Sequence, residues 1–181
     1  MRFQNTIKFV AAYALFIWAN GIFAQSNAPY AGQQTRSIKA LSRGETQDLL
    51  DGKGMGLAKA AELNGYPGPM HVLELARRLQ LSPAQREASE QLMAQHKAQV
   101  RQLGAQLVQA EALLDAAFAT RQITPEQLTQ HTQRIGQLQA AVRTAHLQTH
   151  LAQTALLQPE QIAQYNTLRG YTPARPHDYS N

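Results

Sequence analysis

Apolar residues recur every three or four positions over two long stretches of the chain, which is the pattern of amphipathic helices that share a seam. The seam of the first stretch, residues 83–120, passes through Met93, His96, Val100, Leu103, Leu107, Ala110, Leu114 and Ala117. The seam of the second, residues 125–156, passes through Leu128, His131, Ile135, Leu138, Val142 and Ala145, and then through Leu147 and Leu151. Because only a short connection separates the stretches, we predict a long antiparallel helical hairpin.

Three segments share a helix-start pattern of an apolar residue, a polar residue, proline, a variable residue and glutamine. They are LSPAQ at residues 81–85, ITPEQ at 123–127 and LQPEQ at 157–161. Proline suits the first helical position, where its missing N–H would have no partner. In the first copy Ser82 can accept from the N3 backbone N–H and Gln85 can reach back to the cap. The third copy predicts a last helix that runs to about Arg169 and is closed by Gly170.

The segment before the hairpin is rich in glycine and contains only short helical pieces. Ser42 and Glu45 fit a capping box, residues 57–63 form a second short piece, and Pro69 can open a helix that runs to about Leu79. Seams that contain so much alanine bury little area, so we predict that the chain forms a homodimer. The expected fold is all-α, with a long hairpin and shorter flanking helices in a four-helix, cradle-like arrangement.

The N-terminus has the three parts of a secretory signal. Arg2 and Lys8 form a basic region, residues 9–18 are an unbroken apolar run, and Ala24 offers a small residue for cleavage. The run is shorter than the roughly 20 residues of a transmembrane helix, although an uncleaved anchor remains an alternative. We therefore predict export to the periplasm. The predicted signal, flexible lead-in, Gly-rich segment, helical domain and disordered tail are residues 1–24, 25–41, 42–69, 70–170 and 171–181.

Composition and charge exclude several classes of function. The chain has 17 basic and 12 acidic residues and no cysteine, so thiolate metal sites, disulfides and cysteine nucleophiles are absent. Removing residues 1–24 takes away two basic residues, and the net charge falls from +5 to +3. The basic residues do not cluster, which argues against a nucleic-acid partner. No paired carboxylates or nucleophile elbow are evident, so we predict neither enzymatic activity nor a required cofactor.

Two histidine-containing pairs are candidates for binding metal. His146 and His150 are four residues apart and share a helix face, as two ligands of one ion would. A third ligand could come from His71 or Glu74, which are three residues apart, or from a dimer mate. The alternative is that His146 and His150 are half-exposed polar residues beside the seam. His96 lies within the seam, where a hydrogen-bonded core histidine is expected.

The repeated motif around a long helical hairpin, in an exported chain without cysteine, resembles the Spy/CpxP family of periplasmic proteins. Over residues 70–170 the two copies of its LTxxQ motif correspond here to Leu81, Ser82 and Gln85, and to Leu157 and Gln161. Ser82 replaces the threonine of the first copy. Gln158 replaces that of the second and removes its hydroxyl cap.

The resemblance implies two functions. The first is an ATP-independent chaperone or envelope-stress accessory protein that binds unfolded or misfolded periplasmic proteins, with Leu92, Met93, Arg101 and Phe118 as candidate client contacts. The alternative is a periplasmic heavy-metal sensor or resistance protein. Such a protein would bind zinc, nickel, cobalt or copper through His, Glu and Met side chains, and a membrane-bound signalling protein is a possible partner.

Overall fold

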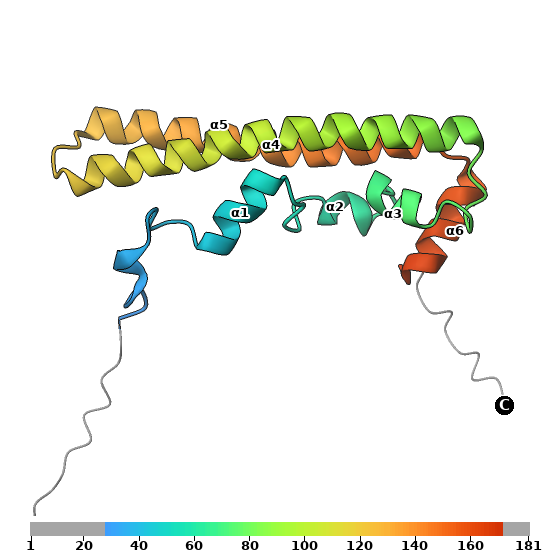
Figure 1. The fold of residues 1–181 in the computed structure, drawn as a ribbon, viewed down its shortest axis with the longest axis horizontal. Coiled ribbons are helices and arrows are strands. Elements are labelled where there is room, and N and C mark those ends of the chain that lie inside the picture. Colours follow the sequence, from blue (N-terminus) through green and yellow to red (C-terminus); the bar gives the residue numbers. More distant parts are fainter. Residues whose placement is uncertain (1–27, 172–181) are drawn as a thin grey trace, which may run out of the picture. The chain divides into compact units, whose positions relative to one another are not determined.

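The computed structural model describes residues 28–171 (Figure 1). The predicted signal peptide and most of the predicted tail lie outside these residues. Residues 28–32 form a turn of their own, and residues 33–171 form one unit. The elements of this unit are η1 (Gln33–Thr35), α1 (Arg43–Asp51), α2 (Lys59–Glu62), α3 (Pro69–Glu74), α4 (Pro83–Ala119), α5 (Pro125–Ala155) and α6 (Pro159–Arg169). Its described part contains no strand, so the predicted all-α class is confirmed.

The two long helices, α4 and α5, pack against each other as an antiparallel hairpin (Figure 1). Both begin at the predicted prolines and end within one residue of the predicted ends. At the turn between them, Arg121 adopts a left-handed backbone conformation with φ of 56°. Among residues 28–171, none of the helices combines the length and the apolar character needed to cross a bilayer.

The shorter helices follow one side of the hairpin. Figure 1 shows α1, α2 and α3 in a row beside α4 and α5, with α6 at the open end of the hairpin. The predicted capping box of Ser42 and Glu45 starts α1, and Gly52 closes it in a left-handed conformation. The short helices therefore form a second layer on one side of the hairpin.

The apolar core has two parts. One lies in the middle of the hairpin and contains Leu49, Leu107, Ala110, Ile135 and Leu138. The other lies at the open end and contains Val72, Leu79, Leu157 and Tyr165. Between the two parts, the buried side chains of the hairpin include four polar ones, Ser89, His146, Thr149 and Gln153, beside Val100, Val142 and Ala145.

The predicted continuation of the α5 seam through Leu147 and Leu151 is wrong at Leu151, whereas Leu147 is half-buried. Leu151 is 56% exposed, whereas the buried residues of this part of the helix are His146, Thr149 and Gln153. The reason lies in the partners of α5, because here it contacts α2 and α3 as well as α4. A helix buried against several neighbours at once does not show its buried face as one apolar stripe.

Two predicted boundaries near the short helices also need correction. The helix that opens at Pro69 ends at Glu74 instead of continuing to Leu79, because from Ala76 onward the backbone mixes shorter turns with helical bonds. Within the predicted flexible lead-in, residues 38–41 dock on the hairpin. Ile38 is buried, and Lys39 forms an ion pair of 3.0 Å with Asp115 of α4.

The two motif glutamines, Gln85 and Gln161, bind each other. Each carboxamide donates to the oxygen of the other, over N···O distances of 2.8 and 3.1 Å. Each oxygen also accepts from the backbone N–H of its own helix cap, Ser82 or Gln158. The remaining N–H groups donate to backbone carbonyls, that of Gln85 to Leu156 and that of Gln161 to Leu79. The motif therefore caps two helices and joins their starts.

Candidate metal centre

A cavity of about 570 Å³ lies between the hairpin and the short helices. Four of the six histidines of the chain line it, and they come from three helices: His71 of α3, His96 of α4, and His146 and His150 of α5. We call this space the histidine-lined cavity. It occupies the region where the buried residues of the hairpin include polar side chains.

Hydrogen bonds determine which nitrogen of His96 carries the proton. The Thr149 hydroxyl donates to the carbonyl of Ala145 at 2.8 Å. Its oxygen lies 2.9 Å from Nδ1 of His96, so this ring nitrogen must be the donor. The Nε2 atom of neutral His96 is then left with a free lone pair. The His96 ring also meets the His146 ring edge to face, with 4.7 Å between the ring centroids.

His150 is held in the same way by a backbone group. Its Nδ1 lies 2.7 Å from the carbonyl oxygen of Tyr66, which can only accept. The neutral imidazole therefore carries its proton on Nδ1 and keeps a free lone pair on Nε2. The ring packs so closely on Gly68 that a Cβ there would lie 2.8 Å from Nε2. Gly68 is thus what allows His150 to occupy this position.

The imidazole of His71 is also held through Nδ1, in this case by a carboxylate. Its Nδ1 lies 2.8 Å from Oε2 of Glu74. Histidines that bind metal through one nitrogen usually donate the other N–H to a carbonyl or carboxylate, which orients the ring. His71 and His150 both have such an acceptor, and His96 has a hydroxyl in its place.

Three buried polar atoms of residues that line the cavity have no hydrogen-bond partner among the described residues. They are Nε2 of His146, a residue only 5% exposed, Oε2 of Glu62 and Nε of Arg169. The other oxygen of Glu62 accepts from the Tyr165 hydroxyl, and Nδ1 of His150 lies 3.6 Å from Oε2. Burying a polar atom without a partner costs about 1–3 kcal/mol. The lone pairs of the His146 and Glu62 atoms are of the kind that a metal ion binds, whereas the Arg169 N–H is a donor and would not be satisfied by a cation.

Burial keeps two of these imidazoles neutral. It lowers the pKa of His96 to about 4 and also lowers the pKa of His146, and in both cases the neighbouring histidines add to the effect. A neutral imidazole is the form that binds a metal ion. Burial therefore favours the ligand form of both side chains, and His96 keeps it well below neutral pH.

The structure brings most of the predicted metal residues to one place. His146, His150 and His71 all line the histidine-lined cavity. Glu74 does not line it, and its carboxylate holds His71 instead. Within residues 28–171, no three His, Asp or Glu side chains already stand together as ligands of one ion. A site here therefore requires side chains to move toward each other.

Sequence reasoning missed two residues of this cavity, Glu62 and His96. Glu62 is 84 residues from His146 in sequence, and a four-residue helix gives no pattern that could point to it. His96 was assigned to the core, and it is indeed hydrogen bonded, but it also lines the cavity. In the antiparallel hairpin, His96 of α4 lies opposite His146 of α5. This pairing of positions across the hairpin is the signal that could have identified His96.

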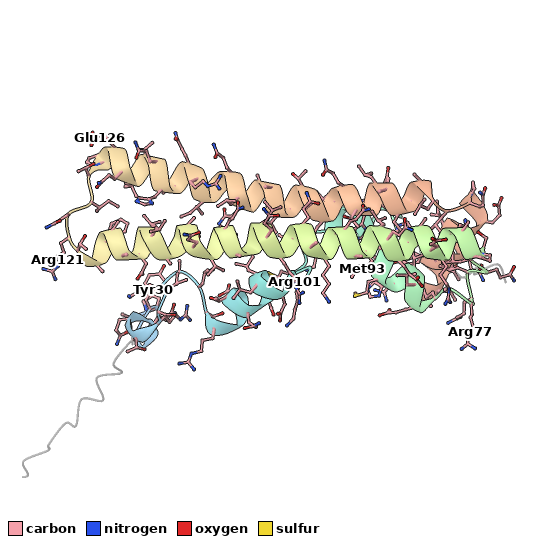
Figure 2. All side chains as sticks on the ribbon, turned by 45° about the horizontal axis from the view of Figure 1, so that its top comes forward. Tyr30, Arg77, Met93, Arg101, Arg121 and Glu126 are labelled. Atoms are coloured by element: carbon pink, nitrogen blue, oxygen red, sulfur yellow. The ribbon has the colours of Figure 1, made fainter. Side chains whose placement is uncertain are left out.

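The candidate client contacts do not form one surface. Met93 lines the histidine-lined cavity, and Arg101 lies on α4 beside the short helices (Figure 2). Leu92 is half-buried. Phe118 lines a separate hollow of about 450 Å³ with Lys39, and at about 1.5 Å per residue it is roughly 37 Å from Met93 along α4. The chaperone function stays a prediction.

Lowering the pH from 7 to 5 is expected to destabilise the fold by about 1 kcal/mol through His96. The unfolded chain binds a proton at this residue below about pH 6.5, whereas in the fold the pKa is about 4. Stability is therefore lost as the pH falls between these values, with His146 and His150 as the titratable groups that face His96.

Urea unfolding followed by helical circular dichroism at each pH measures this loss. A His96→Gln variant should lose less stability between pH 7 and 5 than the wild type, and a His131→Gln variant should behave like the wild type. Identical pH dependence in the His96→Gln variant and the wild type would show that His96 is not the responsible group.

The fold and this cavity define a helical-hairpin protein with a cluster of imidazole donors. Comparison with known families shows that the chain belongs to the heavy-metal resistance family, whose profile matches residues 56–164. That family is part of the Spy/CpxP-like fold clan. The match contains all four cavity histidines and Glu62. No curated protein and no solved structure matches the chain.

Proposed function

We propose that this protein is an exported heavy-metal resistance or sensor protein of the periplasm, which binds a transition-metal ion in the histidine-lined cavity. The observation that carries the proposal is the shared state of His71, His96 and His150. Each donates through Nδ1 to a fixed acceptor and keeps a free Nε2 at one cavity. The family membership supports the same function.

The ligands we assign are His146, His150, His96 and Glu62, and His71 is a further imidazole donor at the same cavity. His146 and Glu62 each contribute a buried acceptor atom that has no hydrogen-bond partner among the described residues. Imidazole and carboxylate donors suit zinc, nickel, cobalt and copper, and together they allow a site of four ligands. Binding would require these side chains to approach one another, because no three His, Asp or Glu side chains of residues 28–171 already stand together as ligands.

Titration calorimetry of the purified protein with zinc, nickel, cobalt and copper tests the proposal. At least one ion should bind with a Kd of about 10 μM or tighter, since a functional site needs more than millimolar affinity. The double variant His146→Ala, His150→Ala should bind at least tenfold more weakly. His131→Ala is the matched control, because His131 lies on the same helix away from the cavity.

Two further variants separate the assigned ligands from their neighbours. Gly68→Ala should weaken binding because its methyl group would collide with the His150 ring at 2.7–2.8 Å. Glu62→Gln should weaken binding more than Glu74→Gln. Helical circular dichroism confirms that each variant is folded. Absence of binding below 100 μM in the wild type, or wild-type affinity in the double variant, contradicts the proposal.

A further inference from the structure

Three of the four methionines of the chain line the histidine-lined cavity, and the fourth, Met1, lies outside the described residues. Met55 comes from the Gly-rich loop, Met70 from α3 and Met93 from α4. The chain has no cysteine, so thioethers are its only sulfur donors. Every sulfur-containing residue of 28–171 therefore lines the cavity that also holds four histidines.

Core packing does not account for two of these methionines. Met55 is 43% exposed and Met70 is 50% exposed, so neither buries much apolar area. Met55 also adopts a left-handed backbone conformation, with φ of 46°, between Gly54 and Gly56. A glycine would adopt this conformation freely, whereas a side chain there costs about 1 kcal/mol. Met55 and Met70 thus line an open cavity instead of filling a core.

The charge around the cavity disfavours ions of high charge. Four cationic side chains line it, and two carboxylates oppose them: Lys53, Lys59, Lys97 and Arg169 against Asp51 and Glu62. Coulomb repulsion from this excess is twice as large for a divalent ion as for a monovalent one. Neutral thioether and imidazole donors can bind a monovalent ion without the carboxylates that hard divalent ions prefer.

We propose that the histidine-lined cavity selects a soft monovalent ion, Cu(I) or Ag(I), and that Met55, Met70 and Met93 set this preference. The proposal rests on the metal-binding function given above. Thioether sulfur is a soft ligand that favours Cu(I), whereas nickel, cobalt and zinc sites rely on imidazole and carboxylate. The histidines would then serve any bound ion, and the methionines would decide which ion binds most tightly.

The test compares Cu(I), Ag(I) and zinc in the wild type and in the triple variant Met55→Leu, Met70→Leu, Met93→Leu. Cu(I) is titrated without oxygen in competition with a chromophoric chelator, and Ag(I) and zinc by calorimetry. Leucine keeps size and apolarity and removes only the sulfur. The triple variant should lose at least about a hundredfold in affinity for Cu(I) and Ag(I), because direct ligands are removed. Its affinity for zinc should change less than threefold.

Methyl resonances of the methionines give a second readout that does not depend on affinity. On addition of Ag(I), the Cε methyl signals of Met55, Met70 and Met93 should shift, and single Met→Leu variants assign each signal. Zinc should leave all three unmoved. Leu151→Met is a matched control, since it places an exposed thioether on α5 away from the cavity, and its signal should not respond to either ion.

The outcomes separate this inference from the proposed function. If zinc or nickel binds through His146 and His150 while the triple variant keeps its affinity for Cu(I) and Ag(I), the metal function stands and the preference is overturned. Unmoved methyl signals in the presence of bound Ag(I) overturn it as well. If no ion binds at all, the proposed function itself fails.

Discussion

Replacing Gly104 by alanine is expected to destabilise the fold by about 3 kcal/mol or more, a cost typical of overpacking at a rigid contact. A Cβ at this position would lie 2.1 Å from the carbonyl oxygen of Leu49 and 2.8 Å from its carbonyl carbon. Both are backbone atoms of α1, so no side chain can turn away to make room. The new methyl group must push α1 off α4, and Leu49 would leave the mid-hairpin core.

Gly136 provides the matched control for this prediction. It lies in the other long helix, and a Cβ there would meet nothing within 4 Å. Alanine is the better helix former by roughly 1 kcal/mol, so Gly136→Ala should stabilise the protein slightly. Urea unfolding of both variants measures the difference. Equal stability of the two variants would show that α1 does not pack on Gly104 as described.

The packing of α1 on α4 also connects the short helices to the candidate metal centre. Gly52 closes α1, and a Cβ at this position would lie 2.6 Å from a methyl group of Val100 on α4. The loop that follows it lines the histidine-lined cavity through Gly54, Met55 and Gly56. Displacing α1 would therefore also move one wall of the cavity.

The elements that the sequence predicted well are those determined by neighbouring residues. The capping boxes of Ser82 with Gln85 and Thr124 with Gln127 are present, and Gly170 closes the last helix. A cap needs only three or four consecutive residues, and proline at the first helical position restricts the same backbone. Local interactions of this kind leave a direct trace in the sequence.

Contacts between distant segments explain what the sequence did not predict. Gly104 and Gly136 look alike in sequence, yet only Gly104 touches another helix. Leu151 matches the seam spacing and is exposed, because α2 and α3 take part in covering α5. The direction in which a helix is buried depends on all its neighbours, and the spacing along one helix records only part of them.

In the candidate site, too, some residues could be predicted from neighbouring positions and others depend on contacts between distant segments. The pair His146 and His150 was predictable because residues four apart share a helix face. Glu62 was not, since its approach to His150 depends on how a four-residue helix docks on α5. The role of Glu74 changed for a related reason. Its three-residue spacing from His71 places the carboxylate next to the imidazole, where it accepts a hydrogen bond instead of lining the cavity.

Replacing Gln161 by alanine is expected to cost about 2–3 kcal/mol of stability, which is large for one half-buried amide. The variant loses both hydrogen bonds to Gln85, the bond that caps Gln158 and the bond to the carbonyl of Leu79. Gln85→Ala should have a similar effect, because it makes the equivalent set of contacts. Urea unfolding of each variant gives the values.

Gln127 is the control that separates pairing from capping. It caps Thr124 in the copy at residues 123–127 but is exposed at the turn of the hairpin, with no partner glutamine among its described contacts. Gln127→Ala should therefore cost only about 0.5–1 kcal/mol, the usual value of a helix cap. If all three variants lose the same stability, the motif acts through capping alone.

A double-mutant cycle then measures the bond between the two helix starts directly. When Gln85 and Gln161 are both replaced by alanine, the loss should be smaller than the sum of the single losses by about 1 kcal/mol, because each single variant already breaks the shared pair. An additive result would mean that the two glutamines stabilise their helices independently. A coupling energy between Gln85 and Gln161 would instead explain why the motif occurs at the starts of both helices that meet at the open end of the hairpin. There the pair joins α4 to α6, next to the apolar core of Leu157 and Tyr165.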